Sequence, residues 1–385
     1  MTKLFIGASL IILIVVAGYV MWPQIVFGPT DSLLPVYDSN SSGDFQLVDR
    51  VFLTDLEVPW EVFDLGDAIL VTERPGRLVL IEAGDVRVIY DNAEQLADSA
   101  EGGLLGMTLH PQFNNNRYLY IYETYDSNAD VTKNRVLRFT LSDDLQSIEQ
   151  ATIIVDDIPG AMYHDGGRIA FGPDHKLYVT TGDATQPELA QDLGSLAGKI
   201  LRLNDDGSVP ADNPFSNSLV FSYGHRNPQG MAWDHRGVMY SSEHGPSGLE
   251  SGQDEINRII AGGNYGWPYW SGTERPGPDE DSPIPNPQWP VAASGSEDTW
   301  APASLTVWRG NLWFAGLRGQ ALYQFEVESG RITRHLVEDF GRLRTTSIAA
   351  DGSLLITTSN RDGRGSPNDQ DDRVIKYDLI TTTAQ

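Results

Sequence analysis

The sequence predicts an all-β fold, a six-bladed β-propeller of four-stranded antiparallel blades that follows an N-terminal apolar helix. From about residue 45 onward, short apolar or alternating runs are separated by Gly, Asp, Asn and Pro, a pattern typical of strands and turns. Few segments have the 3.6-residue period of a helix. We expect short helices only, for example in residues 93–105 and 188–201.

A loose repeat indicates the number of blades. Each copy has a turn containing Gly, Asp or Asn, then a strand, then a polar loop. Six copies follow one another at intervals of 42 to 73 residues, centred on Leu70, Leu119, Leu177, Met239, Leu312 and Leu354. Six repeats of this length predict six blades, and equivalent loops should meet at one end of the propeller. A β-sandwich or a barrel with coincidental turns is the alternative.

The N-terminus predicts export. Lys3 precedes an apolar run over residues 4–22, which suits a signal peptide or a membrane-spanning helix. The best cleavage site, at residues 17–19, is poor, so we favour an uncleaved membrane anchor. A buried core helix is the other interpretation. We expect a linker over residues 23–44, a propeller over residues 45–385 and a periplasmic location.

Composition narrows the possible functions. The net charge is −26, from 27 basic and 53 acidic residues. This charge argues against nucleic acid and against anionic membrane surfaces as partners. The chain has no cysteine, which excludes disulfides, thiolate metal sites and cysteine nucleophiles. Redox chemistry would therefore need a bound cofactor. Nucleotide-binding and hydrolase motifs are also missing from the sequence.

His164 is the first candidate catalytic residue. It precedes a predicted strand and is followed by Gly166 and Gly167, which would let a ligand approach closely. A neutral histidine can take a proton from a hydroxyl group near pH 7. Asp183, at the end of the next strand, could hold its other ring nitrogen. A histidine that merely hydrogen-bonds a loop is equally compatible with this pattern.

Arg226 lies in a second candidate segment, before Asn227 and Pro228. The proline favours an extended turn, which could present the guanidinium rigidly to a carboxylate or to a developing negative charge. An arginine that only ties two loops together is the alternative.

Calcium binding is suggested by loop carbonyl groups at Gly245 and Pro246, with Glu255 and Tyr265 as further oxygen donors. Without other information, Asp254 and Glu255 would equally suit a solvated pair.

Three later arginines, Arg318, Arg342 and Arg344, could form an anion site. Arg342 and Arg344 alternate along a strand and should point to the same side. Two surface arginines on an edge strand are the ordinary alternative.

Together these segments resemble the soluble glucose/sorbosone dehydrogenase family, and within it the aldose sugar dehydrogenases. The matching strings occur in the family's order, over residues 101–107, 110–113, 164–174, 178–183, 198–204, 206–208, 224–230, 243–246 and 254–268. The resemblance implies a six-bladed propeller with pyrroloquinoline quinone (PQQ) and Ca²⁺, an aldose sugar as substrate and an external electron acceptor.

The resemblance also implies residue roles. His164 would take the proton of the anomeric hydroxyl while hydride passes to the quinone, and a lactone would leave. Asp183 would orient His164, and Arg226 and Asn227 would contact the quinone. The cofactor carboxylates would be bound by Arg318, Arg342 and Arg344. Backbone carbonyls of Gly245 and Pro246 would hold the cofactor's calcium, and Glu255 and Tyr265 a separate structural calcium.

Three positions depart from the family's best-known glucose enzymes, which have Gln, Asp and Gln where this chain has Glu101, Tyr163 and His244. Glu101 is expected beside the cofactor as a binding residue, although its charge is unusual there. The long insertions of the dimeric glucose enzymes are missing, which implies a monomer with an open site. A calcium-dependent lactonase and a non-catalytic propeller that binds a partner are the competing functions.

Overall fold

The computed structural model describes residues 36–37, 45–97, 99–127, 131–149, 151–246, 252–274, 284 and 287–381. The predicted N-terminal helix lies outside these residues, as does most of the predicted linker. Within the described part, no helix is long and apolar enough to cross a membrane.

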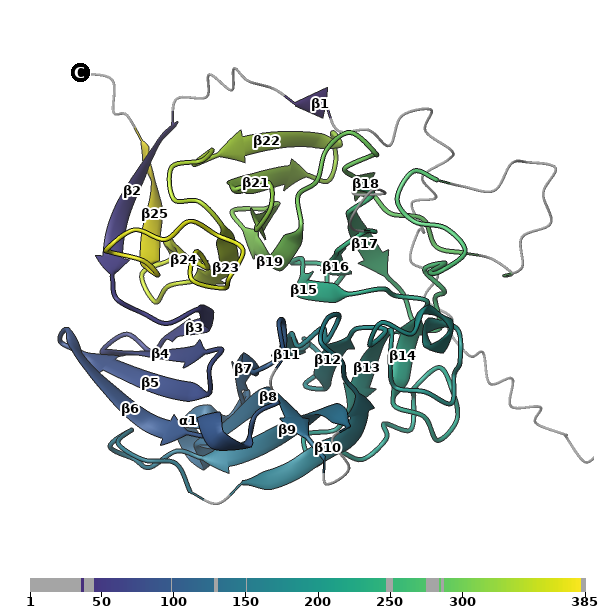
Figure 1. Cartoon of the computed structure of the whole chain (residues 1–385), viewed down its shortest axis with the longest axis horizontal. Coiled ribbons are helices and arrows are strands. Elements are labelled where there is room, and N and C mark those ends of the chain that lie inside the picture. The colour runs from purple at the N-terminus through teal and green to yellow at the C-terminus, as the bar shows by residue number, and fades with distance from the viewer. Residues whose placement is uncertain are drawn as a thin grey trace, which may run out of the picture. The chain divides into compact units, whose positions relative to one another are not determined.

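Residues 33–385 form one unit in which six antiparallel sheets are arranged around a common centre, so the predicted six-bladed propeller is confirmed (Figure 1). The first blade contains β3 (Pro59–Asp64), β4 (Ala68–Glu73), β5 (Arg77–Glu82) and β6 (Asp85–Asp91). The second contains β7 (Leu104–Leu109), β8 (Tyr118–Asp126), β9 (Thr132–Thr140) and β10 (Thr152–Pro159). The third contains β11 (Ile169–Phe171), β12 (Leu177–Thr181), β13 (Lys199–Leu203) and β14 (Val220–Tyr223).

The other three blades follow the same order. The fourth contains β15 (Pro228–Trp233), β16 (Met239–Glu243), β17 (Glu255–Ile259) and β18 (Ala292–Ala293). The fifth contains β19 (Pro302–Trp308), β20 (Asn311–Gly316), β21 (Ala321–Glu326) and β22 (Arg331–His335). The sixth contains β23 (Leu343–Ile348), β24 (Leu354–Thr358), β25 (Val374–Thr381) and β2 (Phe45–Leu53).

The sixth blade joins the two ends of the propeller sequence. Strand β2 pairs antiparallel with β25, from Phe45 opposite Thr381 to Leu53 opposite Val374 (Figure 1). This pairing closes the ring, because β2, which comes just before the first blade in the chain, completes the last blade. Strand β1 (Val36–Tyr37) adds to the fifth blade by parallel pairing with β22, so the predicted linker contains a short strand.

Each of the six repeat residues lies on the second strand of a different blade, and each is at most 4% exposed. The two predicted helices are wrong. Only short 3₁₀ turns form in the described part of these ranges, at Ala93–Gln95 and Pro187–Ala190. Loops follow, and only residues 104–105 and 199–201 belong to β7 and β13. Gly103 and Gly198 have φ values of 141° and 65°, which interrupt a helix just before each strand begins.

Arg168 fills the centre of the ring. This buried side chain ion-pairs with Glu61 of β3 and donates to the carbonyl oxygens of Gln229 (2.9 Å) and Ala303 (3.0 Å). It also lies 3.4 Å from Oγ1 of Thr345. These partners lie on the innermost strands of four blades, so one arginine ties most of the ring together. A buried charge is tolerated here because its donors are paired.

Candidate active site

A cavity of about 740 Å³ opens at one end of the blades, which we call the cavity end. Its walls come from loops that link one blade to the next and from loops after the second strand of a blade. The lining residues are Glu101, Tyr163, His164, Thr185, Arg226, Asn227, His244, Gly245, Pro246, Asp254, Thr299, Ala301, Leu317, Arg318, Gln320, Arg342 and Arg364. The repeat loops therefore meet at one end of the propeller.

His164 lies on the cavity wall with its ring held by Asp183. Nδ1 of His164 is 2.7 Å from Oδ1 of the fully buried Asp183. That carboxylate also accepts hydrogen bonds from the Thr185 N–H (2.8 Å) and from Nε1 of Trp267 (2.8 Å). A carboxylate at Nδ1 favours the tautomer with a proton there, an assignment that rests on the hydrogen-bond partner. Nε2 then carries the free lone pair, as a general base requires.

The backbone around His164 is tightly constrained. His164 has a φ of 67°, in the left-handed region that a residue with a side chain rarely adopts. A Cβ atom at Gly182 would lie 1.8 Å from the carbonyl oxygen of His164, so glycine is required there. The loop that carries His164 therefore packs directly on the loop that carries Asp183.

Arg226 and Asn227 reach the cavity from the loop before β15. The Arg226 N–H donates to the Glu243 carboxylate, and its guanidinium lies 5.4 Å from the centre of the Trp267 ring. Glu243 in turn contacts Nδ1 of His225 at 2.8 Å. Buried partners thus fix the main chain at Arg226, which supports the rigid presentation expected of the Asn-Pro turn.

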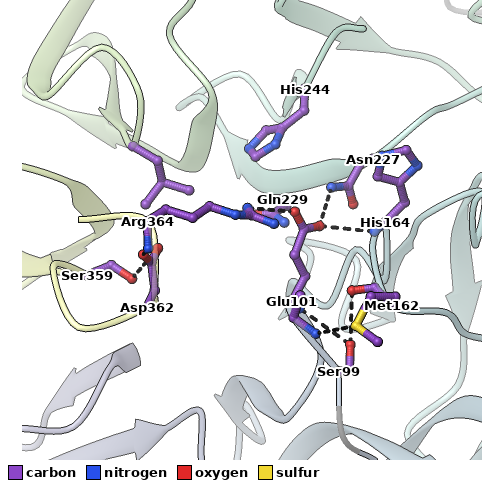
Figure 2. A network of polar contacts seen from close by, with 12 residues as sticks. Ser99, Glu101, Met162, His164, Asn227, Gln229, His244, Ser359, Asp362 and Arg364 are labelled. Carbon is purple, nitrogen blue, oxygen red and sulfur yellow. Dashed lines mark hydrogen bonds and ion pairs between the residues drawn. The ribbon is translucent and has the colours of Figure 1, made fainter. Parts of the chain in front are cut away.

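Glu101 joins several parts of the site (Figure 2). Its Oε2 accepts the His164 N–H at 3.0 Å and lies 3.4 Å from Nδ2 of Asn227, while Oε1 is 2.9 Å from Nη1 of Arg364. Burial alone would raise the pKa of Glu101, but the His164 hydrogen bond and the nearby His244 and Arg364 outweigh it and lower the pKa to about 2. Glu101 is therefore ionised, with its described contacts made to protein donors.

The late arginines lie at different depths. Arg342 lines the cavity and pairs with Asp362 at 2.8 Å, whereas Arg318 is exposed and has no ion pair with a described residue. Arg344 does not line the cavity. It lies beneath, 3.9 Å from Asp362 and 3.4 Å from Oε1 of Gln229. Arg342 and Arg344 thus approach the same carboxylate, but only Arg342 reaches the cavity wall.

Sequence reasoning missed Asp362, Arg364 and Trp267. Asp362 belongs to a repeat loop noted for its polarity, and Arg364 follows it by two residues. Their place in a polar loop after a repeat strand was the signal in the sequence that could have identified Asp362 and Arg364 as site residues. The contacts of Arg364 with Glu101 and of Trp267 with Asp183 join residues 263 and 84 positions apart, which a local motif does not reveal.

The predicted calcium residues fall in two places. Gly245 and Pro246 line the cavity beside Asp254, whose Oδ1 accepts the Gly245 N–H at 2.9 Å. Burial raises the pKa of Asp254 to about 6. Next to them, His244 is half-buried and lines the cavity. Its Nε2 is shielded from solvent and has no hydrogen-bond partner among the described residues, and burial lowers the pKa of His244 to about 3.

Glu255 and Tyr265 lie at a smaller hollow, which they share with Glu243 and Ser271. Burial, with a contribution from the Glu243 carboxylate, raises the pKa of Glu255 to about 8. The Ser271 hydroxyl has no partner in the described chain. Two carboxylates and a spare oxygen fit a bound cation. No group of three or more His, Cys, Asp or Glu side chains suited to a metal ion is found in the residues described.

The fold and this cavity define a propeller with a His–Asp pair, several arginines and carbonyl-rich loops gathered in one pocket. The glucose/sorbosone dehydrogenase family model matches residues 56–367. The chain therefore belongs to this family, and its relatives include sugar dehydrogenases.

Known proteins agree with this assignment. The PQQ-bound aldose sugar dehydrogenase of Streptomyces coelicolor is 34% identical with a TM-score of 0.77, covering 87% of this chain and 99% of that one. An oxidoreductase (glucose dehydrogenase) of Thermus thermophilus is 41% identical with a TM-score of 0.76, covering 87% and 100%. Aldose sugar dehydrogenase YliI of Escherichia coli is 29% identical over 82% of this chain and 90% of its own length.

Proposed function

We propose that this protein oxidises aldose sugars at the anomeric carbon to lactones, with PQQ and Ca²⁺ as cofactors. The observation that carries the proposal is the His164–Asp183 pair at 2.7 Å on the cavity wall, with Nε2 of His164 left for a substrate proton. The PQQ-bound Streptomyces relative supports the choice of cofactor.

The cavity suits a tricarboxylate. Arg226, Arg318, Arg342 and Arg364 line it, against two lining carboxylates, Glu101 and Asp254. Arginine forks match carboxylates in geometry and charge. We propose that Arg318 and Arg342 bind the cofactor's carboxylates, and that Arg344 acts from beneath by holding Asp362 and Gln229. Gly245 and Pro246 would offer their carbonyl oxygens to the cofactor's calcium, and Glu255 and Tyr265 would hold a structural calcium.

When bound, the quinone supplies the two-electron acceptor for the hydride that leaves C1 of the sugar. His164 takes the proton of the anomeric hydroxyl at Nε2, and the C1–O bond becomes the lactone carbonyl. Asp183 stabilises the imidazolium that results, because its carboxylate already accepts a hydrogen bond from the Nδ1–H of His164. Arg226 and Asn227 line the same cavity, and Arg226 would stabilise the negative charge that hydride transfer places on the bound cofactor.

The remaining expectations complete the proposal. The protein would be exported to the periplasm, tethered by its N-terminal segment, and would act as a monomer that passes electrons to an external acceptor.

Titration of the apo protein with PQQ and Ca²⁺ tests the function. We expect a change in quinone absorbance and, with a panel of aldoses, dye reduction that needs both cofactors. His164→Ala should lower kcat by about 1,000-fold while quinone binding persists. No sugar-dependent dye reduction after full reconstitution would contradict the proposal. Lactone hydrolysis without quinone would favour the lactonase instead, and ligand binding with no turnover the non-catalytic module.

A further inference from the structure

The cavity has a deep wall and a mouth that differ in exposure. On the deep wall, the His164 and Arg342 side chains are 16% and 9% exposed. At the mouth, Tyr163 is 43% exposed and the Arg364 side chain 44%. A cofactor that occupies the wall at Arg342 leaves the mouth at Tyr163 and Arg364 to the molecule that enters last, which in the proposed function is the sugar.

The mouth is adjacent to the proposed base. Tyr163 precedes His164 in the chain, and the Arg364 guanidinium lies 5.5 Å from the centre of the Tyr163 ring. Glu101 accepts the His164 N–H at 3.0 Å and pairs with Arg364 at 2.9 Å. Figure 2 shows the Arg364 side chain reaching across to the Glu101 carboxylate, with Asn227 and His164 on the other side of Glu101. A sugar whose anomeric hydroxyl meets His164 therefore has this pair beside it.

The pair is close to electrically neutral. Glu101 is ionised because its hydrogen bonds and neighbouring charges hold its pKa near 2, and Arg364 is a permanent cation. Only Nη1 of Arg364 is bonded to Glu101, so the guanidinium has further N–H donors for a ligand. The hydroxyl groups of a sugar can accept hydrogen bonds from these N–H donors. A carboxylate would meet the Glu101 charge at close range, which opposes its binding.

We propose that Arg364 is a specificity-determining residue that contacts the sugar's ring substituents, and that Glu101 positions it and cancels its charge so that neutral aldoses are preferred to uronic acids. This inference rests on the proposed function. It also gives Glu101 a different role from cofactor binding: it holds the His164 main chain, the Asn227 amide and Arg364 together across three blades.

Galactose and galacturonate test the proposal, because they differ only in a hydroxymethyl or carboxylate group at C5. In Glu101→Gln the Arg364 charge is uncovered, and the ratio of kcat/KM for galacturonate over galactose should rise about tenfold. In Arg364→Gln the Glu101 charge remains, and the ratio should fall by a similar factor. Saturation-transfer NMR of both sugars on cofactor-free protein should show the same order of preference.

Arg236→Gln is the matched control. Arg236 pairs with Asp234 at 2.8 Å with exposures of 44% and 12%, against 44% and 14% for Arg364 and Glu101, but it lies in the β15–β16 turn at the other end of the blade. In Arg236→Gln, the ratio of kcat/KM for galacturonate over galactose should equal that of the wild type. Quinone affinity, measured by absorbance, should be unchanged in Glu101→Gln. If Glu101→Gln changes the quinone affinity but not the galacturonate/galactose ratio of kcat/KM, the proposal is overturned, and Glu101 is a cofactor-binding residue instead.

Unchanged ratios in both site variants would likewise overturn it. Arg364→Gln, at a half-exposed side chain, provides the test if Glu101→Gln fails to fold. If wild-type protein binds quinone but oxidises no sugar, the proposed function fails by itself. The NMR comparison of the two sugars then still decides whether Arg364 and Glu101 discriminate charge.

Discussion

The two ends of the blades are built in different ways. At the end opposite the cavity, which we call the turn end, the first two strands of five blades join in a short local turn. In the second blade, residues 110–117 join β7 to β8 and include the short helix α1 (Phe113–Asn116). Gly352, at the turn end, has a φ of 84°, and a Cβ atom on it would meet nothing within 4 Å. At the cavity end, Gly182 is required because a Cβ atom would lie 1.8 Å from His164. Glycine thus serves backbone conformation at one end and close packing of distant loops at the other.

Charged groups follow the same division. At the turn end, Asp234 and Arg236 pair within one turn, and the Asp351 side chain is 57% exposed. At the cavity end, Asp183, Asp362 and Glu101 are at most 14% exposed and pair with residues from other segments. Turn-end structure is therefore encoded mainly within single turns, with some contacts between blades, such as the hydrogen bond in which Asp64 accepts the Ala350 N–H at 3.0 Å. The cavity end depends mainly on contacts between blades.

The largest expected effect breaks the packing of the cavity end. Gly182→Ala should destabilise the protein by about 3 kcal/mol or more, because the new methyl group overlaps the His164 carbonyl and backbone cannot move aside cheaply. Gly352→Ala should cost only about 1 kcal/mol, the strain of a left-handed φ. Urea unfolding of both variants measures the difference. Equal losses would mean that the two ends do not differ in this way.

This division explains what the sequence could predict. The six repeat residues and the blade count were predictable because each turn and strand is specified within about ten residues. The pairing of β2 with β25 was not, because it joins segments more than 300 residues apart. The two wrong helices had a suitable periodicity, but the blades require loops and the start of a strand from the same residues.

For the site, the sequence was informative where the candidate residues lie directly before or after a predicted strand. His164 and Asp183 flank one strand pair, and their contact at 2.7 Å is present. The alternation of side chains along a strand predicted that Arg342 and Arg344 point to the same side. It carries no information on how deep each side chain lies. Arg344 was therefore expected at the cavity, but it lies beneath the cavity wall. The Glu101–Arg364 pair depends on ring closure and could not be derived locally.

A second prediction compares two aspartates on either side of one strand. Asp174 precedes β12 and accepts hydrogen bonds from the Tyr178 hydroxyl and from Nε of Arg202, both at 3.0 Å, whereas Asp183 follows β12. Asp183→Asn should lower kcat about 100-fold, because the amide no longer stabilises an imidazolium at His164. Asp174→Asn should leave kcat unchanged. Steady-state kinetics at several pH values test both, and similar kcat losses in the two variants would refute a special role for Asp183.

A third prediction concerns Asp165, which is buried beside His164. Burial raises the pKa of Asp165 to about 7, and its Oδ2 lacks a partner within the described chain. A carboxyl group whose pKa is raised on folding favours the folded state at low pH, and that contribution is lost as pH rises from about 4 to 7. Asp165→Asn should therefore stabilise the protein at pH 7.5 by about 3 kcal/mol relative to its effect at pH 4.5. Urea unfolding of both proteins at the two pH values measures this; a pH-independent difference would argue against the shifted carboxyl.

The smallest expected effect lies at the turn end, where Lys376 pairs with Asp351. Hydrogen bonds from Lys376 and Ser353 lower the pKa of Asp351, yet its carboxylate is largely exposed, so water and salt screen the pair. Lys376→Met should cost no more than about 0.5 kcal/mol, and the loss should vanish in 1 M salt. Arg342→Met removes a cation from a pair whose side chains are 9% and 2% exposed, so its larger cost should persist in salt. Thermal unfolding of both variants at low and high salt distinguishes the two ends. A salt-resistant loss at Lys376 would mean that its ion pair is not screened, although the Asp351 side chain is 57% exposed.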